Sequence, residues 1–144
     1  MERKASAVWQ GNLKGGKGTI STASGALSNT QYSFSTRFEN GVGTNPEELI
    51  AAAHAGCFSM ALSAQLGEAG LTADRIDTTA TVTMEKTAAG FTVTASHLDL
   101  RAKIPGASQA AFDKAAGDAS DAKAGCPISR LLNAKITMTA TLEA

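Results

Sequence analysis

The chain has 144 residues, 18% of them charged, and a formal net charge of zero, which fits one domain able to bury about two-thirds of the surface that its unfolded form exposes. The balanced charge, without long runs of Lys or Arg, argues against a nucleic-acid partner. No segment reaches the roughly 18 consecutive apolar residues of a membrane span, and the N-terminus lacks the apolar stretch of a secretory signal. We therefore expect a single cytoplasmic domain, residues 1–144, that binds neither membrane nor nucleic acid.

The N-terminal part of the chain is expected to form short strands. Their predicted ranges are 5–10, 19–22 and 32–38, where apolar and polar residues alternate between turn-rich connectors. In the last range, Phe34 and Phe38 share one face and Arg37 lies on the other, because side chains alternate across a strand.

The predicted central helix covers residues 45–69. Asn45 suits the N-cap, Pro46 the first helical position, and Glu48 completes a variant of the capping box. Gly70 is a stop signal. Because the body of this segment is apolar nearly all round, we expect the helix to be buried.

The C-terminal half combines strands with shorter helices. The sequence predicts strands over 76–86, 91–103 and 135–142, an alanine-rich helix over 108–123, and a short helix that begins at Cys126-Pro127. This order of elements favours an α+β fold with mostly antiparallel sheets around a long buried central helix.

The chain contains two cysteines, Cys57 and Cys126, separated by 69 positions (126 − 57). In a reducing compartment such a pair is more typical of catalysis or redox cycling than of a structural staple. The alternative is two inert core cysteines, since free Cys is among the most buried residue types. Cys126 lies at a helix N-cap, where the dipole and free amides stabilise a thiolate. Cys57, mid-helix among apolar neighbours, should have a raised pKa unless a cation reaches it.

Arg37 is a candidate for that cation, because a guanidinium stays charged at any working pH. Glu47 could orient it through a bidentate ion pair. The alternatives are a solvated strand arginine and a first-turn acid that only interacts with the helix dipole, since surface ion pairs usually contribute little.

His54 lies three residues before Cys57 and shares its helix face. A thiol–imidazole pair would suggest a cysteine hydrolase, although no Asn or Asp is evidently placed to orient the ring. A packed, hydrogen-bonded histidine is the alternative. One His and two Cys do not match the spacing of a zinc site.

Segments 36–39, 43–62 and 123–129, with both cysteines in register, resemble the OsmC/Ohr family, and most closely its OsmC branch, the osmotically inducible hydroperoxide reductases. The similarity begins at Val8 and runs nearly end to end. It implies a thiol peroxidase, acting on organic hydroperoxides and less well on hydrogen peroxide, with an α+β fold in an intertwined homodimer whose two active sites lie at the subunit interface. It implies no metal, haem, flavin or other cofactor.

Carried over residue by residue, the resemblance implies that Cys57 is the peroxidatic cysteine, Cys126 the resolving cysteine, Arg37 the activator of the thiolate, and Glu47 the residue that positions Arg37. A sulfenic acid on Cys57 would condense with Cys126 to a disulfide, and an external thiol would restore both. Two alternatives stay open: a redox-inert dimeric stress or binding protein with both cysteines in its core, and a hydrolase that uses Cys57 and His54.

The spacing on the central helix bears on assembly. Glu47 and Cys57 are ten residues apart (57 − 47), roughly 15 Å along a continuous helix. Either the helix breaks near Gly56, or Arg37 and Glu47 act on Cys57 of the other chain, and we favour the second.

Five apolar residues suggest a pocket for alkyl or aryl hydroperoxides, although they would serve equally well as core: Phe34, Phe38, Phe58, Met60 and Leu62.

Overall fold

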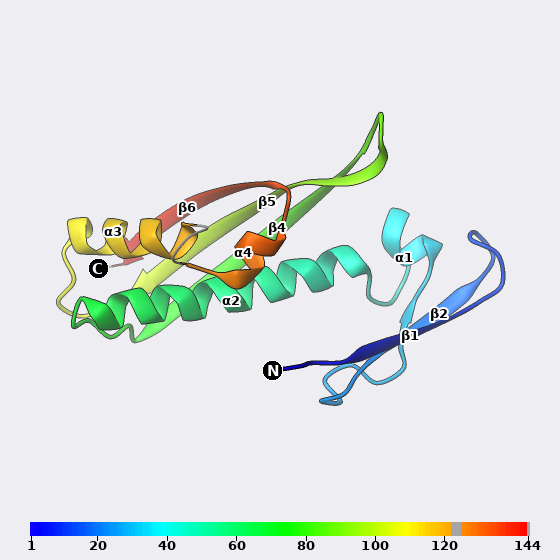
Figure 1. The fold of residues 1–144 in the computed structure, drawn as a ribbon, viewed down its shortest axis with the longest axis horizontal. Coiled ribbons are helices and arrows are strands. Elements are labelled where there is room, and N and C mark those ends of the chain that lie inside the picture. The colour runs from blue at the N-terminus through cyan, green and yellow to red at the C-terminus, as the bar shows by residue number, and fades with distance from the viewer. Residues whose placement is uncertain (122–124, 144) are drawn as a thin grey trace. The chain divides into compact units, whose positions relative to one another are not determined.

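The structure, a computed structural model, describes residues 1–121 and 125–143. Its elements in chain order are β1 (Ala5–Gln10), β2 (Lys17–Thr22), β3 (Thr30–Tyr32), α1 (Phe34–Phe38), α2 (Pro46–Glu68), β4 (Arg75–Thr87), β5 (Gly90–Lys103), α3 (Gln109–Ser120), α4 (Pro127–Leu131) and β6 (Lys135–Glu143) (Figure 1). They form two compact units, Met1–Leu49 and Ile50–Ala144. The α+β class predicted from the sequence is confirmed.

The first unit consists of a small antiparallel sheet, in the order β1-β2-β3, and the one-and-a-half-turn helix α1. The prediction of a strand over 32–38 is wrong beyond Tyr32. Ser33 caps a helix there: its Oγ accepts a hydrogen bond from the Thr36 N–H, and Thr36 Oγ1 accepts one from the Ser33 N–H at 2.8 Å. This reciprocal capping box satisfies the backbone locally, and it overrides the alternating pattern of the segment.

The second unit is built on the sheet β4-β5-β6. β4 and β5 form a long antiparallel hairpin, and Gly90 at its turn has a φ of +108°, a conformation that favours glycine. β6 instead pairs parallel to β5, with Leu98 opposite Met138. The expected mostly antiparallel pairing is confirmed, since β1–β2, β2–β3 and β4–β5 are antiparallel. The pair β5–β6 is parallel because α3 and α4 form a crossover that returns the chain to the end of the sheet near which β5 begins.

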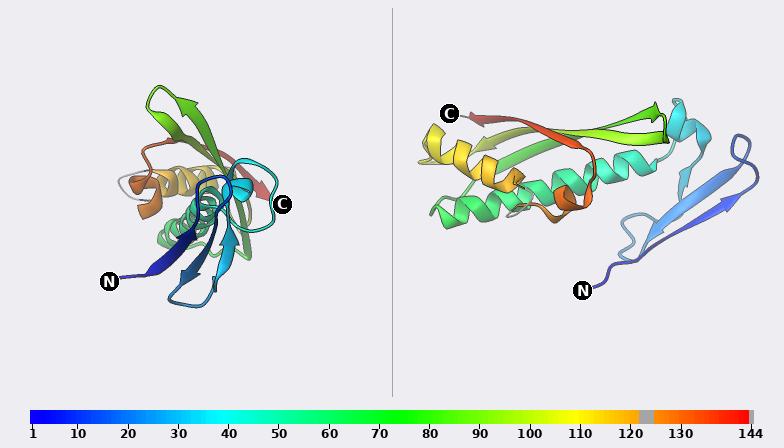
Figure 2. Two further views of the ribbon diagram at one scale, coloured as in Figure 1. Left: turned by 90° about the vertical axis from the view of Figure 1, so that its right-hand side faces the viewer. Right: turned by 45° about the horizontal axis from the view of Figure 1, so that its top comes forward.

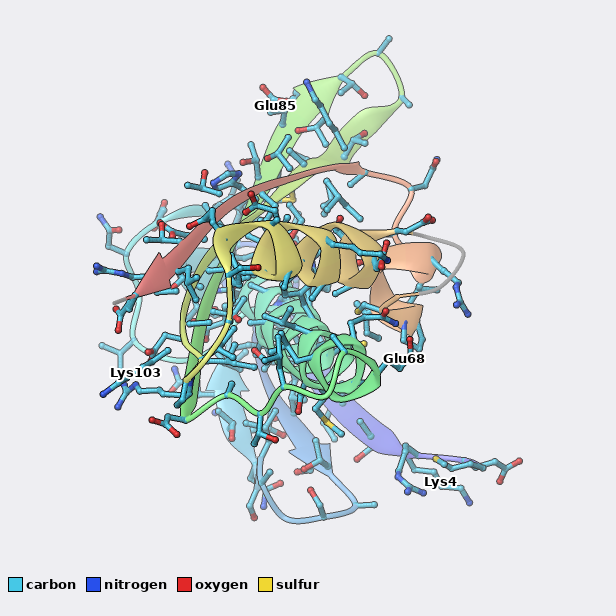
Figure 3. The ribbon with its side chains drawn as sticks, turned by 90° about the vertical axis from the view of Figure 1, so that its left-hand side faces the viewer. Lys4, Glu68, Glu85 and Lys103 are labelled. Carbon is cyan, nitrogen blue, oxygen red and sulfur yellow. The ribbon has the colours of Figure 1, made fainter. Side chains whose placement is uncertain are left out.

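Helices α2 and α3 lie side by side on one face of this second sheet (Figure 2). Figure 3 looks nearly along the axis of α2, with Glu68 labelled at its C-terminal end and α3 running beside it. Between the helices and the sheet lies one hydrophobic core, whose fully buried large side chains are Phe58, Leu62, Leu66, Leu98, Leu100 and Phe112.

Helix α2 begins and ends within a residue of its predicted bounds and is uninterrupted over Pro46–Glu68. The predicted cap is present, since Asn45 Oδ1 accepts a hydrogen bond from the Glu48 N–H at 2.7 Å. The carboxylate of Glu48 does not complete a capping box, because it accepts a hydrogen bond from Thr44 Oγ1, also at 2.7 Å.

The expectation that α2 is buried all round is wrong for a single chain. Its fully buried side chains recur every four residues along one stripe, at His54, Phe58, Leu62 and Leu66. The opposite side is exposed, Met60 included, because the sheet and α3 cover one side of the helix only. By length and composition α2 would also be able to cross a membrane, a property that it shares with the core helices of many globular proteins.

The helix predicted over 108–123 is α3, which begins after the N-cap Ser108, whose Oγ accepts a hydrogen bond from the Ala111 N–H at 3.1 Å. The predicted positions 122 and 123 lie outside the described residues. Helix α4 begins at Pro127 with Cys126 as its N-cap, as predicted.

Leu66 and Leu131 test whether the α2 stripe carries the stability of the second unit. Leu66 is 0% exposed and Leu131 is 75% exposed. Leu66→Ala should lower the free energy of unfolding by about 2–5 kcal/mol, because it leaves a cavity in the core, whereas Leu131→Ala should change it by less than about 0.5 kcal/mol. Urea denaturation at a fixed protein concentration measures both, and equal losses would contradict the assigned core.

Candidate active site

The two cysteine side chains meet in the second unit. Cys57, on α2, is half-buried, and Cys126, at the N-cap of α4, is fully buried. Both are free thiols, and Cys57 forms a side-chain hydrogen bond with Cys126. Residues that are 69 positions apart in the sequence (126 − 57) are thus in direct contact in the reduced protein.

The position of Cys126 is fixed by a close approach between its loop and α3. A side chain at residue 125 would collide with the carbonyl oxygen of Ala119, so that only glycine fits there. The Gly125 N–H donates to the Asp121 carbonyl oxygen at 2.8 Å, and the Cys126 N–H donates to the Ala119 carbonyl oxygen at 3.3 Å. The Gly-Cys-Pro sequence is therefore anchored at the C-terminal end of α3.

The surroundings of Cys57 raise the pKa of its thiol. Burial is the largest cause, the hydrogen bond and charge of Cys126 raise the pKa further, and a hydrogen bond from the Ile128 backbone N–H lowers it. This amide in the first turn of α4 thus serves Cys57, whereas the side chain of Cys126 makes no capping hydrogen bond. The expected raised pKa of Cys57 is confirmed.

The predicted contact between Arg37 and Glu47 is present in the first unit. Arg37 Nε donates to Glu47 Oε1 at 2.9 Å, and Nη2 lies 2.8 Å from the same oxygen. The Arg37 side chain, on α1 rather than on a strand, is 41% exposed and that of Glu47 is 14% exposed. Glu47 Oε2 is buried and has no hydrogen-bond partner among the described residues.

An apolar pocket of about 250 Å³ adjoins this ion pair, and it is lined mainly by Trp9, Leu13, Tyr32, Phe34, Arg37 and Phe38. Phe34 and Phe38 stack four residues apart on α1, with ring centroids 4.8 Å apart. The other three residues of the predicted pocket lie elsewhere: Phe58 and Leu62 are fully buried in the core, and Met60 is 76% exposed.

His54 is fully buried and hydrogen-bonded at both ring nitrogens. Nδ1 lies 2.7 Å from Ser96 Oγ on β5, and Nε2 lies 2.8 Å from Ser129 Oγ on α4. Burial lowers the pKa of this imidazole, which favours the neutral ring. With both nitrogens bound to serine hydroxyls, neither faces the Cys57 thiol as a base, and the packed-histidine interpretation is the one observed.

Sequence reasoning missed three groups of the thiol site. Ser129 carried a weak signal, since it follows Cys126 by three residues just as Cys57 follows His54. No sequence signal pointed to Ser96 or to the Ile128 backbone N–H, because each contacts a segment far away in the chain. Across residues 1–121 and 125–143, no cluster of three or more His, Cys, Asp or Glu side chains could hold a metal ion.

Comparison with known proteins shows which family the chain is similar to. The model of the family described as "OsmC-like protein" matches residues 38–141. The chain is 52% identical over 143 residues to the proteins named Peroxiredoxin OsmC of Escherichia coli K12 and of Shigella flexneri, covering 99% of this chain and 98% of each relative.

Solved structures share the fold. An OsmC-like protein from Mycoplasma pneumoniae superposes with a TM-score of 0.76 at 15% identity, covering 100% of this chain and 99% of that one. The organic hydroperoxide resistance protein OhrB of Bacillus subtilis superposes with a TM-score of 0.66 at 21% identity, covering 97% and 98%.

The causes of the raised pKa at Cys57 can be tested by removing Cys126. Because the hydrogen bond and charge of Cys126 both raise this pKa, Cys126→Ala should move the pH midpoint of Cys57 alkylation to a lower value. The measurement is the rate of iodoacetamide labelling of the Cys57 peptide in reduced protein across pH, read by mass spectrometry. A midpoint that stays in place or rises would contradict the thiol–thiol contact.

Proposed function

The chain belongs to the OsmC family, and we propose that it is a thiol-dependent peroxidase that reduces organic hydroperoxides, and hydrogen peroxide less well, to alcohols or water. The observation that carries this proposal is the pair of reduced, hydrogen-bonded thiols Cys57 and Cys126 in a chain 52% identical to proteins named Peroxiredoxin OsmC.

The proposed cycle uses the two sulfur atoms in order. The Cys57 thiolate attacks the terminal oxygen of the hydroperoxide, the O–O bond breaks, the alcohol leaves, and Cys57 becomes a sulfenic acid. Cys126 then attacks the sulfenic sulfur, so that a disulfide forms and water is released. An external thiol or dithiol reduces the disulfide and restores both cysteines, and the cycle needs no cofactor.

Within one chain the groups around Cys57 favour its neutral thiol, whereas attack on a hydroperoxide requires the thiolate. A nearby guanidinium would lower the pKa, and the Arg37–Glu47 pair is suited to supply it. Glu47 holds two guanidinium nitrogens with one oxygen, while 41% of the Arg37 side chain stays exposed. In this proposal Arg37 activates the thiolate and Glu47 positions Arg37.

The geometry of α2 favours a site shared between subunits. Because the helix is uninterrupted from Pro46 to Glu68, Glu47 and Cys57 are separated by roughly 15 Å along its axis. One arginine cannot bind Glu47 directly and touch the Cys57 of the same straight helix. We therefore place Arg37 and Glu47 of one subunit at the Cys57 of its partner.

Three features support the homodimer that such a site requires. The side of α2 opposite the core is exposed and consists of small residues around Met60, which allows a second helix to approach closely, and strand β1 is exposed along its whole length, including Trp9. Glu47 Oε2 is buried without a described hydrogen-bond partner, which a donor from a second subunit would supply.

The aromatic pocket beside Arg37 is suited to the organic part of the substrate. A pocket of about 250 Å³ with mostly aromatic walls fits an alkyl or aryl group, and the exposed guanidinium of Arg37 at its edge would face the peroxide oxygens.

We further propose that the whole chain, residues 1–144, acts as one OsmC/Ohr-like domain in the cytoplasm, whose thiol pools would supply the reductant.

The alternative functions differ in which thiols they need. A hydrolase would use His54 as a base toward Cys57, and the binding of both imidazole nitrogens to serines disfavours it. A redox-inert binding protein would retain both thiols after exposure to hydroperoxide.

Thiol titration and intact mass separate these functions. One equivalent of cumene hydroperoxide should remove both free thiols, lower the mass by about two units through disulfide formation, and yield stoichiometric alcohol. Cys57→Ser should abolish hydroperoxide consumption, and Cys126→Ser should accumulate oxidised Cys57 without the disulfide. Two thiols that still titrate in folded, reduced wild-type protein, with the peroxide unconsumed, would reject the peroxidase.

Mixed dimers test the shared site. A heterodimer of Arg37→Ala and Cys57→Ser subunits, isolated with two different affinity tags, has one complete site if Arg37 acts across the interface. It should recover about half of the wild-type rate per dimer by this site count, while each parent homodimer stays inactive. No recovered activity in a verified heterodimer would mean that Arg37 acts within its own chain.

A further inference from the structure

Two contacts between side chains connect α2 with α4 and its N-cap, and they lie parallel to one another like the rungs of a ladder. His54 and Cys57 are three residues apart on α2, and Cys126 and Ser129 are three residues apart at the start of α4. His54 pairs with Ser129, and Cys57 pairs with Cys126. Because residues three apart share a helix face, the hydrogen-bond rung and the thiol rung hold the same two segments in register.

The hydrogen-bond rung is anchored to the sheet as well as to the helices. The imidazole of His54 binds Ser96 Oγ of β5 through Nδ1 at 2.7 Å and Ser129 Oγ of α4 through Nε2 at 2.8 Å. His54 and Ser96 are 0% exposed, and Ser129 is 4% exposed. In a neutral ring one nitrogen donates and the other accepts, so each serine hydroxyl has a matching role. The ring therefore has one fixed orientation.

The backbone of the N-cap Cys126 is already bound to Ala119 of α3, so the contribution of Ser129 concerns helix α4 itself. It is only five residues long, too short to be stable by itself, and it buries only Ser129 among its own residues. The same short element carries Cys126 at its N-cap and supplies the Ile128 N–H that binds Cys57. Whatever holds Ser129 in place therefore also helps to hold the Ile128 N–H and, together with the anchor on α3, the Cys126 side chain that contacts Cys57.

We propose that His54 is a positioning residue for the resolving step: by binding Ser129 it holds α4 against α2 and keeps Cys126 beside Cys57. The inference rests on the proposed peroxidase function and deepens it. His54 touches neither sulfur in this role, and it acts through Ser129.

The consequence lies in a competition for the Cys57 sulfenic acid. Attack by the Cys126 sulfur forms the S–S bond, breaks the S–O bond and releases the hydroxyl group as water with the proton of Cys126. Attack by the sulfenate on a second hydroperoxide instead takes up an oxygen atom, releases alcohol and gives a sulfinic acid, which an external thiol does not reduce. Loosening α4 slows only the first of these, so more Cys57 becomes over-oxidised per turnover.

Two substitutions of His54 separate its hydrogen bond to Ser129 of α4 from its hydrogen bond to Ser96 of β5. The amide nitrogen of Gln lies where Nε2 of His lies, so His54→Gln keeps a donor for Ser129. The amide nitrogen of Asn lies where Nδ1 lies, so His54→Asn keeps the bond to Ser96 and loses the one to Ser129. Each variant is reduced and titrated with cumene hydroperoxide, and mass spectrometry measures the ratio of sulfinic acid to disulfide.

We expect the ratio in His54→Gln to stay within about twofold of the wild type and the ratio in His54→Asn to rise about three- to tenfold, the factor that corresponds to one net hydrogen bond. Ser59→Ala is the matched control, because it removes a 2.7 Å hydroxyl bond between α2 and Thr78 of β4 without touching α4. It should lower stability and leave the ratio unchanged, which separates positioning from general stabilisation.

If His54→Asn fails to fold, Ser129→Ala and Ser96→Ala replace it, since they delete the hydroxyls at opposite ends of the ring. Ser129→Ala should raise the ratio and Ser96→Ala should not. Equal ratios within either pair, in a protein whose wild type forms the disulfide, would overturn the role of His54 and leave the peroxidase intact. A wild type that forms no disulfide with hydroperoxide would overturn both.

Discussion

The rotation of α2 against its sheet is the constraint on which the thiol site depends. His54, Phe58, Leu62 and Leu66 recur every four residues and are fully buried, so the helix can turn only one way without exposing its core side chains. This orientation places Cys57, the neighbour of Phe58, at the edge of the buried stripe, half-covered and open to α4. A turn of one residue, about 100°, would bury the thiol in the core or carry it away from Cys126.

The two thiols and the Arg37–Glu47 ion pair, to which the proposed peroxide chemistry is assigned, belong to different units. The second unit holds both thiols in a contact that favours the neutral form of Cys57, and the first unit holds the guanidinium and its carboxylate. In the proposed shared site, a guanidinium brought to Cys57 by a second subunit would lower the pKa of its thiol through its charge, in addition to the hydrogen bond from the Ile128 N–H that lowers it within the unit.

The contact between α2 and α4 combines an apolar helix with a polar connection. Burying an imidazole and two hydroxyls would be costly without partners, and both ring nitrogens of His54 are bound to the hydroxyls of Ser96 and Ser129. A buried network of this kind rigidifies the groups that it joins. It defines the position of a short helix that apolar packing alone would leave loosely specified, and that helix carries the second thiol.

The sequence by itself determined the bounds of α2 and of the long strands, because capping residues, apolar patterns and glycine stops are local signals. It also identified the pairs Cys57–Cys126 and Arg37–Glu47 from residue chemistry, and the family resemblance implied the role of each residue. It did not predict α1, where the Ser33–Thr36 capping box outweighed alternation, or the parallel strand β6. Only the tertiary structure decided which amide binds Cys57, which serines hold His54, and that a single chain covers just one side of α2. These depend on contacts between segments far apart in the chain, and such contacts leave no periodicity or spacing that a local pattern could reveal.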